Sequence, residues 1–167
     1  LTIQAGTIIK FKPSDGDYLG LGSGGTIVAN GSASNPIIFT SFKDDDHGGD
    51  TNGDGTATSA NAGDWMHINL NDENGSTFNY CEFYYGGNGS YNYTLTLFGS
   101  QNTQVTNCTF AHNRGGKDGD FYYGALDASQ AEAGTVITGN VFYDNILPLS
   151  VSTSYNLDGS NVFHNPD

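Results

Sequence analysis

A run of acidic residues between Lys43 and Thr56 is the part of the sequence whose composition most directly suggests a chemistry. Five Asp and one Asn fall within 11 positions, from Asp44 to Asp54. Like charges at this density repel one another unless a cation neutralises them. Carboxylate and amide oxygens are the ligands that Ca²⁺ takes in proteins. The segment therefore predicts a calcium-binding loop, with Ca²⁺ as the cofactor.

The spacing inside this loop is typical of calcium ligands. Asp50, Asn52 and Asp54 are separated by single residues, and Gly55 follows them. This order matches the first half of an EF-hand-type loop, in which oxygens at positions one, three and five point inward and a glycine permits the sharp turn. Thr56 would then offer its backbone carbonyl at position seven.

The second half of the loop departs from that pattern. Position twelve is Asn61, where an EF-hand has a bidentate Glu. The missing carboxylate therefore has to come from a neighbouring Asp: Asp44, Asp45, Asp46 or Asp64. Among these we expect Asp44, Asp46 and Asp64 to complete the site. A solvated acidic loop without a metal is the alternative.

Two aromatic segments offer a second chemistry. Residues 82–86 and 120–124 each consist of an acidic residue, three aromatic residues and a glycine. Tyrosine rings that point outward beside a carboxylate can stack on the faces of sugars. The candidate ligand-binding residues are Tyr84, Tyr85, Tyr122 and Tyr123. Tyrosine is also common in strands, where alternate side chains point outward in any case, so both interpretations stay open.

The overall charge narrows the range of partners. The 18 Asp and Glu outnumber the 5 Lys and Arg, which gives a formal net charge of −13. This charge disfavours nucleic acid and anionic membrane surfaces, because both bind through cationic side chains. No apolar run reaches the roughly 18 residues of a membrane helix, so membrane insertion is not expected. Ten Phe and ten Tyr supply the apolar surface of a folded core.

Short strands are the elements that must position these residues. Gly, Asn, Ser, Thr and Asp interrupt every stretch, and only residues 125–133 favour a helical turn. The short apolar runs predict strands of about five residues. They cover residues 7–11, 25–29, 36–41, 67–70, 93–98, 135–137 and 148–151.

A repeat favours a solenoid over a sandwich. Four segments end at Phe83, Phe110, Phe142 and Phe163, at intervals of 27, 32 and 21 residues. The residues two places before these are Cys81, Cys108, Asn140 and Asn161. Stacked coils bring equivalent residues to about 4.8 Å from one another, so that like side chains form ladders. We therefore expect both cysteines to face inward as buried thiols.

Several segments resemble a known family. Residues 6–11 and 25–41 resemble the opening coils of right-handed parallel β-helix domains in secreted and surface proteins of bacteria, and the coils that end in Phe look like their pectate-lyase-like repeats. The resemblance implies an all-β, right-handed, single-stranded parallel β-helix, a solenoid into which the calcium-binding loop is inserted. It also implies an exported bacterial protein, usually multidomain, in which this module is often not the catalytic one.

The resemblance raises the question of a lyase. Many parallel β-helices cleave acidic polysaccharides with calcium and a basic side chain, and here only Arg114, with Lys117 nearby, offers such a pair. The Arg-x-Pro-x-x-Arg pattern of pectate lyases is absent, and the net charge would repel polyuronates. We assign no catalytic residue.

Residues 1–167 are expected to form one domain, a fragment of a larger protein, located outside the cell or on its surface. The predicted function is a non-catalytic, calcium-stabilised β-helical module that acts as a scaffold or binds a polysaccharide or cell-surface glycan. The alternative is a polysaccharide-active enzyme, a lyase or glycoside hydrolase, with bound calcium. Open solenoid ends also predict end-to-end self-association.

Overall fold

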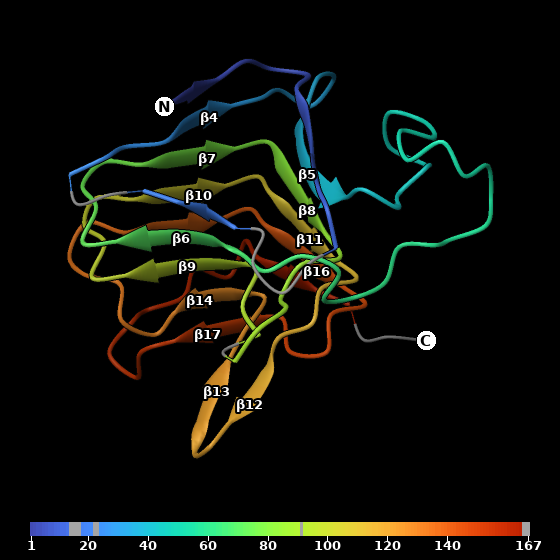
Figure 1. Ribbon diagram of the computed structural model, residues 1–167. Coiled ribbons are helices and arrows are strands. Elements are labelled where there is room, and N and C mark those ends of the chain that lie inside the picture. Colours follow the sequence, from blue (N-terminus) through green and yellow to red (C-terminus); the bar gives the residue numbers. More distant parts are fainter. Residues whose placement is uncertain (14–17, 22–23, 91, 165–167) are drawn as a thin grey trace.

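The computed structural model describes residues 1–13, 18–21, 24–90 and 92–164, and this part of the chain contains 18 strands and no helix. Sixteen of the strands form three parallel sheets, and the other two form an antiparallel hairpin (Figure 1).

The order of strands in each sheet follows the order of the chain. Sheet A consists of β1 (Thr2–Ile3), β4 (Val28–Asn30), β7 (Thr77–Asn79), β10 (Gln104–Thr106) and β15 (Val136–Thr138). Sheet B consists of β2 (Ile8–Phe11), β5 (Ile37–Ser41), β8 (Cys81–Tyr84), β11 (Thr109–Ala111), β16 (Val141–Tyr143) and β18 (Val162–Phe163). Sheet C consists of β3 (Leu19–Gly20), β6 (Ile68–Asn71), β9 (Leu95–Phe98), β14 (Leu126–Ala128) and β17 (Leu149–Val151). The hairpin consists of β12 (Gly116–Asp118) and β13 (Phe121–Tyr123).

The chain passes through the three sheets in turn, and each strand pairs in parallel with its equivalent in the next coil. This arrangement is a parallel β-helix, so the predicted all-β solenoid is confirmed. The seven strand segments expected from apolar runs all overlap observed strands. Several further strands have only two or three residues, and their sequence signal is correspondingly weak.

The repeated phenylalanines form a ladder through the core. Phe39, Phe83, Phe110, Phe142 and Phe163 stack with ring centroids 5.0, 4.5, 5.1 and 4.9 Å apart, and neighbouring planes lie within 10° of parallel. Phe39, Phe83, Phe110 and Phe142 are buried by this stacking, which removes their apolar faces from water, whereas Phe163 at the end of the ladder is 45% exposed. The repeat read from the sequence is confirmed by this stacking.

A second ladder runs beside the phenylalanines. Cys81 and Cys108 are buried free thiols, as predicted. Below them the Asn140 amide accepts a hydrogen bond from the Cys108 N–H at 2.8 Å and donates to the Val105 carbonyl and to Asn161 Oδ1. The asparagines therefore satisfy backbone groups that the turn between sheets A and B would otherwise leave without partners.

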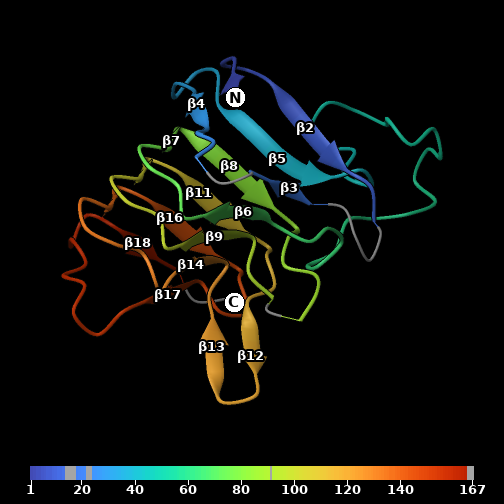
Figure 2. The same ribbon diagram turned by 60° about the vertical axis from the view of Figure 1, so that its left-hand side comes forward.

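The corner from sheet B to sheet C carries the long connections. Residues 42–67 follow β5, residues 85–94 follow β8 and residues 112–125 follow β11, whereas only residues 144–148 follow β16. The opposite case is the corner from sheet A to sheet B, where Tyr80 alone, with a φ of 49°, joins β7 to β8. Variation at one corner explains why the phenylalanine intervals are unequal. Figures 1 and 2 show the loop after β5 and the hairpin projecting from the solenoid.

The helical turn expected at residues 125–133 is wrong. Strand β14 occupies its first part and pairs in parallel with β9 and β17. Ala125, Leu126 and Ala128 are buried in the core, and the backbone hydrogen bonds of this segment go to neighbouring coils. Tertiary pairing therefore overrides the local preference of an alanine-rich segment for helix.

Candidate functional site

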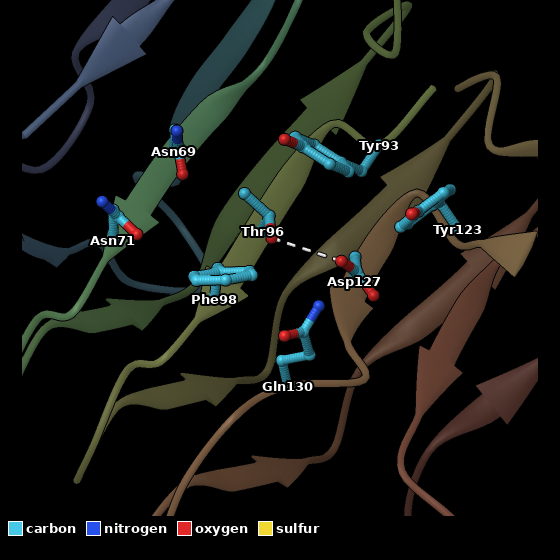
Figure 3. Close-up of a pocket in the computed structure, with 8 residues that line it drawn as sticks. All are labelled: Asn69, Asn71, Tyr93, Thr96, Phe98, Tyr123, Asp127 and Gln130. Atoms are coloured by element: carbon cyan, nitrogen blue, oxygen red, sulfur yellow. Dashed lines mark hydrogen bonds between the residues drawn. The ribbon is translucent and has the colours of Figure 1, made fainter. Parts of the chain in front are cut away.

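A groove of about 360 Å³ lies on the outer face of sheet C. Its floor is a row of outward side chains in register on β6, β9 and β14, namely Asn69, Thr96 and Asp127. Their strand neighbours, such as Ile68 and Leu95, point into the core. The alternation of strands therefore places polar groups in the groove and apolar groups beneath it. Figure 3 shows the side chains that line the groove.

Aromatic and amide side chains form the two ends of the groove. At one end lie Phe98, with 44% of its surface exposed, Asn71 and Gln130. At the other end Tyr93 and Tyr123 meet edge to face, with ring centroids 6.0 Å apart. Because Tyr123 belongs to β13, the hairpin supplies this second wall.

Asp127 is held firmly in the floor of the groove and is 4% exposed. Its carboxylate accepts hydrogen bonds from Ser150 Oγ at 2.6 Å, from the Ser129 N–H at 3.2 Å and from Thr96 Oγ1 at 3.3 Å. These contacts fix the carboxylate as an acceptor that faces outward from the sheet. Asp127 and Phe98 were not among the sequence-predicted residues, because only the strand register reveals that they share a face with Asn69.

The acidic loop begins after β5 with a buried anchor. Asp44 is 2% exposed and accepts hydrogen bonds from Thr40 Oγ1 and from the backbone N–H of Asp46. His47 Nδ1 lies 2.7 Å from the same carboxylate. Burial favours a higher pKa for Asp44, but the hydrogen bonds from His47 and Thr40 outweigh it and lower the pKa. The hydrogen bond to Asp44 raises the pKa of His47.

The end of the loop is fastened by a second carboxylate. Asp64 forms an ion pair with Lys43 at 3.0 Å and accepts a hydrogen bond from Ser41 Oγ at 2.7 Å. It also accepts a hydrogen bond from the Asn61 N–H at 3.1 Å. Asp44 and Asp64 thus have protein partners at the base of the loop.

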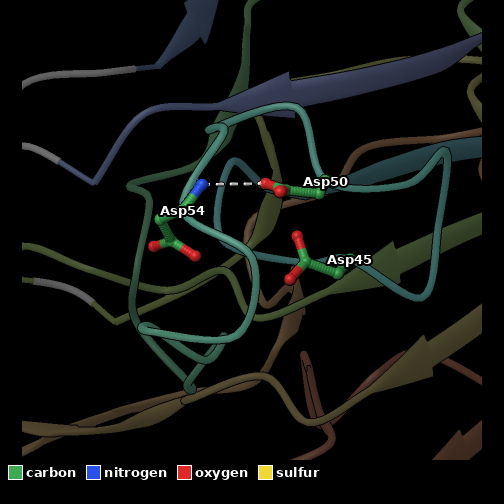
Figure 4. A group of neighbouring side chains, drawn as sticks. All are labelled: Asp45, Asp50 and Asp54. Atoms are coloured by element: carbon green, nitrogen blue, oxygen red, sulfur yellow. Dashed lines mark hydrogen bonds between the residues drawn. The ribbon is translucent and has the colours of Figure 1, made fainter.

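Three other carboxylates converge in the middle of the loop. Asp45, Asp50 and Asp54 have oxygens that all lie within 4.8 Å of one another (Figure 4). One oxygen of Asp45 and one of Asp54 are shielded from solvent without a hydrogen-bond donor. Burial and the negative charges of Asp50 and Asp54 raise the pKa of Asp45. This arrangement is unfavourable for carboxylates alone.

Asp50 is oriented by the loop backbone. Its carboxylate accepts hydrogen bonds from the N–H groups of Gly53, Asp54 and Gly55 at 2.7, 3.1 and 2.9 Å. These bonds, above all the one from Gly55, lower the pKa of Asp50. Gly55 has a φ of +70°, a backbone conformation that glycine adopts readily.

The sequence-predicted ligands divide into two groups. Asp50 and Asp54 do come together, and Asn52 lies beside them, with Nδ2 donating to Asp54 Oδ2 at 3.0 Å. The third carboxylate of the cluster is Asp45, whereas Asp44, Asp46 and Asp64 lie outside it. Asp46 and Thr56 line an adjacent polar pocket of about 280 Å³.

The predicted tyrosine surface is not a single platform. Tyr84 is 8% exposed, and its ring stacks on His47 at a centroid distance of 4.5 Å, because the acidic loop covers this part of sheet B. Tyr85 stacks on His112. Tyr84 points outward from sheet B, but the loop covers its ring, whereas Tyr122 is 63% exposed and lies on the hairpin.

The two candidate catalytic cations lie away from the groove. The Arg114 backbone N–H pairs with the Gly86 carbonyl, and its side chain packs beside Gly63. Lys117 Nζ lies 5.4 Å from the ring centroid of Tyr122 on the hairpin. Among the described residues, the groove lining includes neither cation.

Comparison with known proteins gives one match. A family model described as a pectate-lyase-like β-helix domain matches residues 1–130. Domains of this type are commonly extracellular. No curated protein and no solved structure matches the chain. In the described part of the chain, no helix is long and apolar enough to span a membrane.

Proposed function

The chain belongs to the pectate-lyase-like β-helix domain family, and from this premise we propose that it is a non-catalytic, calcium-stabilised scaffold module of an exported bacterial protein. The acidic loop is the calcium-binding element in this proposal. The stacked coils form the rigid body from which it projects.

One observation carries the proposal: the cluster of Asp45, Asp50 and Asp54 includes two shielded carboxylate oxygens that lack a donor. A hard divalent cation would supply the positive charge and the electrostatic partner that these oxygens lack. These three carboxylates, with the side-chain oxygen of Asn52, are the groups that would hold it. Calcium is preferred to a softer metal because this set offers only oxygen.

Calcium would stabilise the protein through the loop. Asp50 and Asp54 lie in one turn of residues 42–67 and Asp45 comes from an earlier part of the same loop, so without a cation the repulsion between these carboxylates opposes closure of the loop. The same loop covers Tyr84 through the stacked His47. Neutralisation of the cluster therefore favours the closed loop and the surface beneath it. Extracellular calcium-binding modules often have dissociation constants of about 10⁻⁴ to 10⁻³ M, and we expect an affinity in this range for the site.

The non-catalytic part of the proposal rests on the groups at the groove. Glycoside hydrolysis commonly uses a pair of carboxylates, and among the described lining residues Asp127 is the single carboxylate. Polyuronate cleavage needs a base and cations close to the sugar. Arg114 and Lys117 contact other parts of the molecule.

Calorimetry and thermal melting test the calcium site. For a Kd of about 0.1 mM, about 1 mM Ca²⁺ adds about 1.4 kcal/mol of stability, which corresponds to about 3 to 5 °C in Tm. Asp45→Asn and Asp54→Asn should abolish both the binding heat and the shift in Tm. Asp118→Asn is the matched control, because it removes an exposed carboxylate of β12 outside the cluster. This variant should retain the heat of calcium binding and the shift in Tm.

Two results would reject the site. The first is a wild-type Tm that is the same in EDTA and in Ca²⁺, with no heat of binding. The second is a calcium-dependent shift that survives in the Asp45→Asn, Asp54→Asn double variant, which would place the ion elsewhere. Release of unsaturated or reducing-end products from polygalacturonate, lost in Arg114→Ala, would overturn the non-catalytic assignment.

A further inference from the structure

We propose that Cys81 and Cys108 form a cross-linking site, at which oxidation joins two neighbouring coils of the solenoid through a disulfide bond. Both side chains are free thiols that are fully buried in the core. They are the two cysteines of the chain, so each is the one intramolecular partner that the other has. The acidic cluster shares no residue with this pair, and the proposal is therefore independent of calcium.

The strand register places the two cysteines at equivalent positions of adjacent coils. Strands β8 and β11 pair in parallel, and the residues that directly follow the two cysteines lie opposite one another. The residues that directly precede them, Tyr80 and Asn107, have φ values of 49° and 54°, so the same turn introduces both cysteines. Neighbouring strands lie about 4.8 Å apart, and bridged cysteines have Cα atoms about 4.4 to 6.8 Å apart. The backbone spacing is thus suitable for a disulfide bond.

The two sulfur atoms point along the stack in the same direction. Cys108 Sγ lies 3.5 Å from the Phe78 carbonyl oxygen, which belongs to the coil of Cys81. Cys81 Sγ lies 3.3 Å from the carbonyl oxygen of Ala29, the residue that pairs with Phe78 one coil further on. Interaction with the Cys108 thiol, together with burial, raises the pKa of the Cys81 thiol. A rotation of Cys81 about χ1 is therefore the movement that turns its sulfur towards Cys108.

The bond requires a small contraction of the corner between sheets A and B. A disulfide holds its two Cβ atoms about 3.8 Å apart, whereas equivalent side chains start at the strand spacing of about 4.8 Å. The Cys108 N–H donates to the side chain of Asn140 and not to a neighbouring strand, so its movement towards Cys81 breaks no strand pairing through this group. The S–H groups are weak donors, and their loss costs the carbonyl groups little.

The oxidant in this proposal is a small-molecule disulfide such as oxidised glutathione. Buried thiols are inert, so the reaction precedes the closure of the core. One cysteine thiolate attacks the small disulfide, which gives a mixed disulfide and releases one small thiol. The other cysteine then attacks the mixed disulfide, and a second small thiol leaves with the second proton. The two cysteines are thus oxidised while the small disulfide is reduced to two thiols. Such bonds persist in oxidising compartments outside the cytosol, as in the exported location proposed above.

Refolding of the whole 167-residue chain from urea tests the proposal, with the same Ca²⁺ concentration in every sample. One sample refolds with reduced and oxidised glutathione, and the other refolds with a reductant alone. Each is then denatured, treated with N-ethylmaleimide and weighed by intact mass spectrometry. The first should have lost two hydrogens and take up no label, whereas the second should take up two labels. The oxidised monomer should melt about 5 °C above the reduced monomer, because the bond restricts the unfolded chain.

Cys81→Ala is the matched control, because it leaves Cys108 without a partner. This variant should form no internal disulfide and should melt at the same temperature after refolding in either buffer. Two free thiols in the wild-type protein refolded with oxidised glutathione would overturn the proposal, and so would a bond found only between separate chains. An oxidised monomer that melts below the reduced one would show that the native corner does not accept the bond. These wild-type measurements decide the question even where the variant does not fold.

Discussion

His67 lies in an aromatic environment that opposes its protonation. Its ring packs against Tyr93 and Tyr18, with centroid distances of 4.8 and 5.6 Å. Burial lowers the pKa of His67 from 6.5 to about 4. The imidazole therefore stays neutral in the folded protein at pH values where the unfolded chain binds a proton.

The consequence is a loss of stability in mild acid. Above about pH 6.5 both states are neutral at this position, and below about pH 4 both are protonated, so the free energy of unfolding falls between these limits. Between about pH 7.5 and pH 5 the loss amounts to about 2 kcal/mol. Urea unfolding at the two pH values should show a smaller loss for His67→Gln than for the wild type. His164→Gln, at an exposed histidine, should show the wild-type loss, and an identical loss in all three proteins would contradict the assignment.

At the scale of single residues, the sequence predicts the positions of side chains that recur from coil to coil, but not the positions of side chains that occur in one loop only. Cys81 and Cys108 could be placed inside from their common position before Phe. Asp45 could not be chosen over Asp44, because the three adjacent Asp have equal chemistry and only the path of the loop decides which oxygen meets Asp50. Asp44 is instead buried at the start of the loop, where its carboxylate contacts Thr40 and His47. The spacing of the Asp residues does not indicate these contacts.

Among the elements, the hairpin joins the solenoid through a close backbone approach. A Cβ atom added at Gly124 would lie 2.5 Å from backbone atoms of Leu149 and Ser150. Glycine is therefore required where the chain leaves β13 and enters β14, because a side chain would push β17 away.

Gly124→Ala should lower stability by about 2 kcal/mol, or about 4 to 8 °C in Tm. Gly159→Ala is the matched control, since nothing lies within 4 Å of a Cβ at that position, and it should melt as the wild type does. Differential scanning calorimetry distinguishes the two variants. An unchanged Tm for Gly124→Ala would mean that β14 and β17 can separate at no cost.

The two aromatic segments show why elements are harder to predict than residues. Residues 82–86 and 120–124 have nearly the same pattern, yet the first contributes to β8 in a parallel sheet and the second to β13 in an antiparallel arm. Neither segment was predicted as a strand from its apolar residues, although tyrosine is common in strands. The partner strand depends on the chain outside each segment, which a local pattern does not contain.

At the scale of the whole molecule, the stability of each coil depends on its contacts with the coils stacked on either side of it. Strand β9 in sheet C is paired on both sides, with β6 and β14, whereas β3 and β17 are paired on one side. Amide exchange measured by mass spectrometry should therefore be slowest in β8, β9 and β11 and faster in β3 and β17. The hairpin strands should exchange fastest, because they pair only with each other. Equal protection in all coils would indicate a single cooperative unit instead.

The overall architecture was accessible from the sequence because the solenoid repeats one pattern. The spacing of Phe83, Phe110 and Phe142 predicted stacked coils, and their rings do stack. The groove on sheet C was not accessible in this way. Thr96 and Asp127 are 31 residues apart in the chain and become neighbours only through the register of β9 and β14.

The uneven corner between sheets B and C has a consequence for how such a protein can change over evolutionary time. Residues 42–67 and residues 144–148 occupy equivalent corners, yet β5 and β16 keep the same parallel register with the strands beside them. Insertions and deletions can thus change the length of this corner without changes in the sequence of the stacked strands. For the protein engineer this corner is a site for grafting, at which a foreign peptide could replace the β12–β13 arm, whose strands pair only with each other, while the solenoid supports it.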